Sequence, residues 1–305
     1  MRLLTCRAPV ETAAGPTALV CTAVADGDEV VDLTDPAVGL PGDMAALLAL
    51  GKDGLDAARR APATEARRWR LEEVEILAPV PLPPKVLAIG MNYRAHIEEM
   101  GREPPEHQYW FNKQRTCVAA PEQDILVPAV SEQVDYEGEL GIVIGTRAKG
   151  VPAARWLDVV AGFTVLNDVS VRDWQGHSPT FTMGKSFDTH CPTGPWIVTP
   201  DEVGSVESLT LRTWVNDELR QESPLDLVFT PPEMIEYLTT VFPLEPGDVI
   251  ATGTPAGVGA GFRPPRWLRA GDRVRIEIDR IGVLENPVAA ERPPTPGPSP
   301  VVGTS

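Results

Sequence analysis

The chain of 305 residues is poor in positive charge, and this limits what it can bind. It has 27 Lys and Arg against 43 Asp and Glu, which gives a formal net charge of -16 and a pI near 4.7. Nucleic-acid backbones require patches of Lys and Arg, so the composition argues against non-specific binding to DNA or RNA. An anionic substrate would need positive charge gathered at one place.

Long apolar runs are also missing. No stretch approaches the roughly 20 apolar residues that a membrane-spanning helix needs, and the N-terminus lacks the charged-then-apolar pattern of a secretory signal. We therefore expect a cytoplasmic protein with neither a membrane nor a nucleic-acid partner. With 43% hydrophobic residues, the chain can build a sizeable core in one or two domains.

Cysteines are few and scattered. Cys6, Cys21, Cys117 and Cys191 form no C-x-x-C pair, so neither a thiolate zinc site nor a disulfide framework is indicated. We expect reduced and mostly buried thiols.

Aromatic residues make up only 6% of the chain, and the run Tyr109-Trp110-Phe111 is a local cluster of them. Buried packing is the usual fate of such side chains. We therefore expect these three residues in the core rather than in a platform for substrate.

A proline-rich connector over residues 78–84 divides the chain, because it can neither continue a helix nor donate to a central sheet. Before it, residues 17–33 predict a hairpin that turns at Asp26-Gly27, and a helical pattern begins at Asp43. The sequence thus predicts a small N-terminal domain that ends near residue 80.

After the connector, short apolar runs separated by Gly and Pro predict a β-rich second domain with few helices, so the whole is of mixed α/β class. The predicted domains are 1–80, 81–290 and a Pro-rich tail, 291–305, which we expect to be disordered. The predicted strands are 86–89, 139–144, 159–166, 209–215, 249–252 and 274–278, with a hairpin turn at Asn216-Asp217 and a short helix over 231–241.

Three acids on strand-like segments give the strongest indication of chemistry. Glu137 and Glu139 would share one face of a strand, because successive side chains alternate. A second apolar run ends at Asp168, which can reach the glutamates if the two strands are neighbours. Clustered carboxylates repel one another unless a cation lies among them, so a hard divalent ion is the favoured explanation. The alternative is a solvated acidic strand edge.

His96 and Glu99 are three residues apart, on one face of a predicted helical turn. Glu99 could fix the tautomer of His96 and stabilise its protonated form, as a general base that activates water requires. An ordinary surface pair is the alternative. His107, His177 and His190 have no comparable partner nearby.

Lys185 is one of few lysines in the chain and lies in the small-residue loop 184–188. It could offset the charge of the three acids and hold a substrate carboxylate or a developing enolate. A solvated loop lysine is the alternative.

The loop 252–259 resembles a phosphate-binding loop, but it lacks the Gly-Lys-Ser/Thr ending, so we reject a nucleotide site there. Its glycines permit close approach of the backbone to a ligand. Backbone N–H groups or the Thr254 hydroxyl could therefore meet a ligand carboxylate.

Five segments of the chain carry pieces of one ordered pattern. They are Asn92-Tyr93-x-x-His96-x-x-Glu99, Asp135-Tyr136-Glu137-Gly138-Glu139-Leu140, Asn167-Asp168-Val169-Ser170-x-Arg172-Asp173-x-Gln175, Gly184-Lys185-Ser186-Phe187-Asp188 and Thr252-Gly253-Thr254-Pro255. Together they closely resemble the fumarylacetoacetate hydrolase family. The resemblance runs from about Lys85 to Pro287, and residues 1–80 resemble the small N-terminal domain of many bacterial members.

This resemblance implies a β-roll fold, usually a homodimer, with a lid around His96 that orders when ligand binds. It implies Mg²⁺ or Mn²⁺, for which Ca²⁺ may substitute in crystals. The implied metal ligands are Glu137, Glu139 and Asp168, the catalytic residues are His96, Glu99 and Lys185, and the substrate contacts are Tyr93, Arg172, Gln175, Gly253 and Thr254.

The implied chemistry suits a 2-oxo acid, because three carboxylates leave about three positions of an octahedral ion open. Our first hypothesis is a catabolic hydrolase that cleaves a carbon-carbon bond in a 1,3-dicarbonyl 2-oxo acid of the acylpyruvate or fumarylpyruvate type. Water would be activated by His96 with Glu99. Fumarylacetoacetate hydrolase proper has a further acid where Met91-Asn92 stand here, so the resemblance points to the acylpyruvate hydrolase-like branch.

Two other functions stay open. The same enolate chemistry without water attack would give a tautomerase or isomerase of unsaturated 2-oxo dioates, or an oxaloacetate decarboxylase. A catalytically silent metal-binding member is the third possibility, which the intact His96, Glu99 and Lys185 disfavour.

Overall fold

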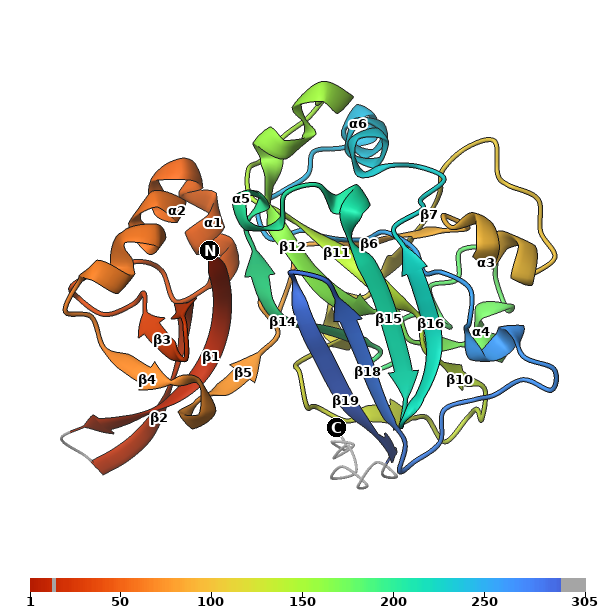
Figure 1. Cartoon of the computed structure of the whole chain (residues 1–305), viewed down its shortest axis with the longest axis horizontal. Coiled ribbons are helices and arrows are strands. Elements are labelled where there is room, and N and C mark those ends of the chain that lie inside the picture. Colours follow the sequence, from red (N-terminus) through yellow and green to blue (C-terminus); the bar gives the residue numbers. More distant parts are fainter. Residues whose placement is uncertain (13–14, 292–305) are drawn as a thin grey trace, which may run out of the picture.

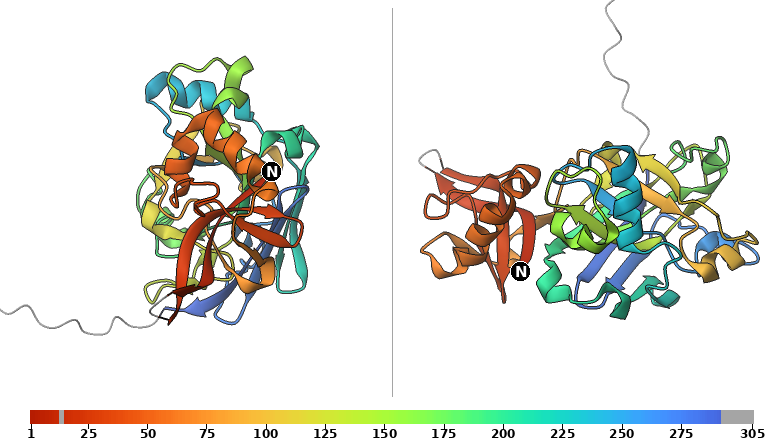
Figure 2. Two further views of the ribbon diagram at one scale, coloured as in Figure 1. Left: turned by 90° about the vertical axis from the view of Figure 1, so that its left-hand side faces the viewer. Right: turned by 90° about the horizontal axis from the view of Figure 1, so that it is seen from above.

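The computed structural model describes residues 1–12 and 15–291, so the tail predicted to be disordered lies outside the described residues except for Glu291. The chain forms a smaller N-terminal lobe and a larger, strand-rich lobe (Figures 1 and 2), and the predicted mixed α/β class is confirmed. Within the described ranges, no helix is long and apolar enough to cross a membrane.

The N-terminal lobe is an antiparallel sheet that carries two short helices. The predicted hairpin is confirmed, since β2 and β3 join at a turn in which Gly27 has a φ of +62°. The predicted helix is α1, and the Asp43 carboxylate accepts a hydrogen bond from the Ala46 N–H at 2.8 Å, which caps it. The elements are β1 (Arg2–Thr12), β2 (Gly15–Asp26), β3 (Glu29–Asp32), α1 (Met44–Ala49), α2 (Gly51–Arg60), β4 (Arg68–Arg70) and β5 (Glu75–Leu77).

One sheet runs through both lobes. Strand β1 pairs antiparallel with β14, with Arg2 opposite Val198 and Leu3 opposite Ile197. The main path of this sheet is β4-β3-β2-β1-β14-β12-β11-β17-β6-β7. The connector 78–84 forms neither helix nor strand, as predicted. The division of the chain into a separate domain at residue 80 stays a prediction.

The larger lobe adds a second sheet, of order β16-β15-β18-β19-β9, and the two sheets enclose the main hydrophobic core. Its strands are β6 (Val86–Gly90), β7 (Tyr109–Lys113), β8 (Val118–Ala119), β9 (Ile125–Val127), β10 (Val134–Asp135), β11 (Gly138–Ile144), β12 (Val160–Asn167), β13 (Ser170–Val171), β14 (Cys191–Val198), β15 (Thr210–Val215), β16 (Glu218–Pro224), β17 (Val249–Ala251), β18 (Arg273–Ile278) and β19 (Gly282–Ala290). Its helices are α3 (Arg94–Glu99), α4 (Arg172–Gln175), α5 (Pro200–Val203) and α6 (Pro231–Val241).

The six predicted strands match β6, β11, β12, β15, β17 and β18, and the predicted helix matches α6. The strand β14 was missed because Pro192 and Pro195 interrupt it, and proline normally argues against a central strand. The strand β19 likewise contains Pro287. Local pattern is weakest where proline lies inside a strand.

The predicted alternation along β11 separates the core from the site. Leu140, Ile142 and Ile144 belong to the main core between the two sheets, whereas Glu139 lines a cavity. Gly138 is required here, because a Cβ atom at this position would lie 2.3 Å from the Thr213 Oγ1. One strand thus supplies both core packing and a polar wall.

Candidate metal and active site

A cavity of about 460 Å³ opens between the ends of the central strands and the helices α3 and α4. These two helices lie at the end of the molecule that is remote from the N-terminal lobe (Figure 1). The cavity collects charged residues from four separate segments, namely His96, Glu137, Glu139, Asp168, Arg172 and Lys185. The acids and the bases that the sequence singled out therefore meet in one place.

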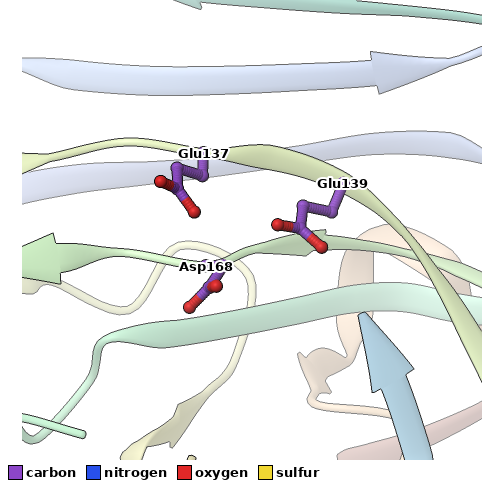
Figure 3. A group of neighbouring side chains, drawn as sticks. All are labelled: Glu137, Glu139 and Asp168. Atoms are coloured by element: carbon purple, nitrogen blue, oxygen red, sulfur yellow. The ribbon is translucent and has the colours of Figure 1, made fainter. Parts of the chain in front are cut away.

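Strand pairing brings the three acids together. Glu137 and Glu139 flank the first residue of β11, and Asp168 follows the last residue of β12. These strands pair antiparallel with Gly138 opposite Asn167, so the three carboxylates share one end of the strand pair. Figure 3 shows them turned toward a common space, and one ligand atom from each lies within 4.8 Å of the others. All three side chains are buried.

Two buried lysines hold Asp168 from opposite sides. The Lys113 ammonium donates to Oδ1 at 2.6 Å, and the Lys185 ammonium donates to Oδ2 at 2.7 Å. Lys185 also donates to Glu137 Oε2 at 2.6 Å, and Arg172 Nη1 lies 2.7 Å from the other oxygen of Glu137. Burial would raise the pKa of Glu137, but Lys185 and Arg172 hold it below its usual range.

Glu139 is the exception within the cluster. Its carboxylate accepts a hydrogen bond from the Gly253 N–H at 2.6 Å and pairs with no cation among the described residues. Burial raises the pKa of Glu139 well above its ordinary value, and repulsion from Asp168 and Glu137 adds to this effect. A buried carboxylate without a counter-charge is costly. An oxygen-preferring dication would supply the missing charge, so the donor set fits Mg²⁺ or Mn²⁺.

The helix α3 carries the predicted proton-transfer pair. The His96 Nδ1 lies 3.1 Å from Glu99 Oε2, while Glu99 Oε1 accepts from the Gly257 N–H at 2.9 Å. Glu99 is thus tied to the body of the lobe, and it orients the imidazole. His96 lines the cavity, and its Nε2 has no hydrogen-bond partner within the part of the chain that the structure describes.

Three of the five predicted substrate contacts line the cavity, namely Arg172, Gln175 and Thr254. Arg172 Nη1 donates to Gln175 Oε1 at 3.1 Å, so the two side chains are coupled. The Thr254 hydroxyl donates to the Gly138 carbonyl at 2.9 Å, which already uses its proton. Their contact with substrate stays a prediction.

The other two predicted contacts do not line the cavity. The Gly253 N–H already donates to Glu139, so it is not free for a ligand carboxylate. Tyr93 is 1% exposed and packs in the main core, and its hydroxyl has no partner among the described residues. Burial raises the pKa of Tyr93, and the nearby charge of Glu139 adds to this. Tyr93 therefore lies close to the acids but behind the cavity wall.

The expectation that the aromatic run packs in the core is confirmed for Phe111, which is buried, whereas Tyr109 is only half-buried. Both residues also line the cavity, where each ring contacts Phe181 at centroid distances of 5.3 and 5.8 Å. Alternation along β7 sends these two side chains to one face, while Trp110 packs against the main core. The cavity wall thus contains apolar rings as well as acids.

The sequence patterns gave no role to Lys113 or Asp135, yet both contact residues of the site. Asp135 is fully buried and accepts hydrogen bonds from the Gly259 and Ala260 N–H groups and from Arg172, so it positions the arginine beside Glu137. The scarcity of lysine that drew attention to Lys185 applies equally to Lys113. Nothing in the sequence places Lys113 near Asp168, because 55 residues separate them.

Comparisons with known proteins identify the family. The family profile for the fumarylacetoacetate (FAA) hydrolase C-terminal domain matches residues 85–289. The bovine mitochondrial oxaloacetate tautomerase FAHD2B is 41% identical over 266 residues, which cover 86% of this chain and 85% of that protein. The Bacillus subtilis oxaloacetate tautomerase YisK is 45% identical over 226 residues, which cover 72% of this chain and 75% of that protein.

Among solved structures, the maleylpyruvate hydrolase from Sphingobium sp. SYK-6, in complex with manganese(II) ion and pyruvate, matches with a TM-score of 0.76 at 33% identity. The match covers 96% of this chain and 100% of that chain. The manganese in that neighbour and the buried acids here support a divalent metal ion for this chain. The bovine relative is named as mitochondrial, so the cytoplasmic location stays a prediction, as does the homodimer.

Proposed function

Because the chain belongs to the fumarylacetoacetate hydrolase family, we propose that it is a divalent-metal enzyme that interconverts the keto and enol forms of a 2-oxo dicarboxylic acid of the oxaloacetate type. The observation that carries the proposal is the His96–Glu99 pair, whose histidine lines the same cavity as the buried acid cluster. The similarity to oxaloacetate tautomerases favours this reaction over our first hypothesis of hydrolysis.

In this proposal Glu137, Glu139 and Asp168 hold Mg²⁺ or Mn²⁺. The ion supplies Lewis-acid polarisation of the 2-oxo group and thereby acidifies the neighbouring carbon. Glu139 is central to the assignment, because it is the buried carboxylate that lacks a cation partner among the described side chains.

His96 moves the proton. In the keto-to-enol direction its Nε2 accepts the proton from C3 of the substrate, the C3–H electron pair becomes the C2–C3 double bond, and the C2–O π pair moves onto the oxygen. Water then protonates this oxygen while the imidazolium releases its proton to water, so no net proton is gained or lost. In the reverse direction the imidazolium returns the proton to C3. Glu99 stabilises the imidazolium through Nδ1 and keeps the ring aimed into the cavity.

Lys185 stabilises the charge that develops on the substrate oxygen. Its ammonium lies in the cavity wall, 2.6 Å from Glu137 and 2.7 Å from Asp168, and packs 5.0 Å from the centre of the Phe111 ring. A buried cation held in this way does not need to reorganise when the enolate forms. Arg172, fixed by Asp135, adds a second positive charge on the same side.

The proposal is tested by mixing enolic oxaloacetate with the protein and trapping the keto form with malate dehydrogenase and NADH. We expect catalysis that depends on Mg²⁺ or Mn²⁺ and stops with EDTA. A parallel lactate dehydrogenase assay detects pyruvate, which would reveal decarboxylation instead. The proposal would be refuted if the metal-loaded protein left the rate of ketonisation equal to the rate with the metal ion alone.

Hydrolysis of an acylpyruvate remains a second candidate, favoured by the same pair of residues and by the similarity to maleylpyruvate hydrolase. Here His96 would deprotonate water for attack on the far carbonyl of a 1,3-dicarbonyl acid. Incubation with maleylpyruvate or acetylpyruvate in ¹⁸O-labelled water separates the two functions. Label in the newly formed carboxylate of a cleavage product would establish hydrolysis. Recovery of the substrate without cleavage would exclude it.

A further inference from the structure

The basic residues that line the cavity differ in whether they already form ion pairs or hydrogen bonds with other residues of the protein. Lys185 is bound to Glu137 and Asp168, and Arg172 is bound to Asp135, Glu137 and Gln175. His96 is paired with Glu99. The remaining basic residue in the wall is Arg102, whose guanidinium has no ion pair or hydrogen bond to any described residue.

The position of Arg102 is fixed by the way α3 ends. Gly101 adopts a φ of +63° and its N–H donates to the Glu98 carbonyl, while the Arg102 N–H donates to the Ile97 carbonyl at 3.0 Å. This pair of hydrogen bonds is the Schellman ending of a helix. Ile97 is buried, so the backbone of Arg102 is held while its side chain stays free.

Several other residues that line the cavity offer little to an anion. Met100, Tyr109, Pro179 and Phe181 also line the cavity, and the Tyr109 hydroxyl donates to the Pro179 carbonyl. A carboxylate at this end of the cavity would therefore find one strong partner. Guanidinium groups bind carboxylates through two parallel hydrogen bonds, which adds direction to the charge attraction.

We propose that Arg102 binds the second carboxylate of the substrate and thereby selects 2-oxo dicarboxylates over 2-oxo monocarboxylates. The inference rests on the proposed function and adds to it a residue that determines specificity. The 2-oxo acid group occupies the end of the cavity with the three acids, and the other carboxylate reaches toward the end of α3.

Binding is measured without turnover, by calorimetry on the Mn²⁺-loaded protein with pyruvate and with 2-oxoglutarate. We expect the wild type to bind 2-oxoglutarate about tenfold more tightly than pyruvate, which is the gain from one charge-assisted contact. In Arg102→Met this preference should vanish while the affinity for pyruvate is unchanged. In Arg102→Lys part of it should remain.

The matched control is Arg94→Met, which removes an exposed arginine of the same helix that does not line the cavity. It should keep the wild-type preference. Equal affinity of wild type and Arg102→Met for 2-oxoglutarate would overturn the proposal, as would a parallel loss for both ligands. A matching loss of preference in Arg94→Met would also overturn it, because the effect would then be general electrostatics.

Catalysis gives an independent readout if oxaloacetate is turned over. The 4-methyl ester of oxaloacetate keeps the carbon skeleton and removes the second charge. Arg102→Met should raise the KM for oxaloacetate about tenfold, with little change in kcat, and leave the KM for the ester unchanged. If neither compound is turned over, the proposed function fails, yet the binding preference still decides the role of Arg102.

Discussion

The two sides of the cavity are built in different ways. The acid side consists of Glu137, Glu139 and Asp168, which are buried at the ends of paired strands; Lys113 and Lys185 pair with Asp168, and Lys185 also pairs with Glu137. The α3 side consists of His96, Glu99 and Arg102. The first two lie on a six-residue helix, and Arg102 belongs to the turn that ends this helix. The acid side is buried, whereas on the α3 side His96 and Glu99 are half-buried and Arg102 is exposed.

This difference matches two different tasks. A metal site needs ligands that are already in place, because moving buried charges during the reaction is costly. Proton transfer and recognition of a second carboxylate need groups that substrate can reach. We therefore expect changes on the acid side to alter stability and metal binding, and changes on the α3 side to alter turnover and selectivity alone.

The largest effect should come from Glu139→Gln. Loss of this carboxylate removes a metal ligand in our proposal, so turnover should fall by at least about 10³-fold. Without metal the variant should be more stable than the wild type, because Gln is neutral and avoids the cost of burying an ionisable carboxyl group, which the raised pKa of Glu139 reflects. Differential scanning calorimetry with and without Mn²⁺ measures both effects. If Mn²⁺ raised the Tm of Glu139→Gln by as much as it raises the Tm of the wild type, Glu139 would be excluded as a ligand.

His96→Asn should lower turnover by about 10² to 10³-fold, the usual contribution of general acid–base catalysis. Its Mn²⁺ affinity and its Tm should stay near those of the wild type, because the α3 side does not support the metal ligands. Electron paramagnetic resonance of free Mn²⁺ gives the affinity. A weakened metal site in this variant would erase the distinction between the two sides.

Lys113→Met should destabilise the metal-free protein by about 3 kcal/mol, since it leaves a buried oxygen of Asp168 without its cation. Burial alone would lower the pKa of Lys113, but Asp168 raises it above its ordinary value, so the lysine is charged. Added Mn²⁺ should restore part of the loss, which makes the metal-induced rise in Tm larger than in the wild type. The exposed Lys149→Met is the control, and we expect it to change neither quantity.

Acid should destabilise the fold through His190, and we expect this effect to be smaller. The side chain of this residue is fully buried, and its Nε2–H donates to the Leu126 carbonyl at 2.8 Å. Its Nδ1 has no partner among the described residues, and burial lowers the pKa of His190 to about 4. The unfolded chain binds the proton near pH 6.5, so the free energy of unfolding falls as the pH drops from 6.5 to 4, by at most about 3 kcal/mol.

The pH dependence is measured by urea denaturation across that range. His190→Gln should flatten the slope, whereas the exposed His107→Gln should leave it unchanged. An unaltered slope in His190→Gln would show that other groups cause the acid sensitivity.

Residue type and local spacing were sufficient for much of the outline. The hairpin at Gly27, the capped helix after Asp43 and six strands follow from turn, cap and alternation patterns, since each depends on neighbours in the chain. The pairing of His96 with Glu99 also follows, because three residues span one helical turn.

The convergence of the site depends on contacts between residues far apart in the chain. The register of β11 against β12 places Asp168 beside Glu137, and β7 delivers Lys113 from 55 residues away. Local patterns carry no information on which strands pair or on what lies behind a carboxylate. The residues of the sequence thus specify the kind of chemistry, whereas contacts between distant segments set which carboxylates of the cluster are neutralised and which one is left without a cation partner.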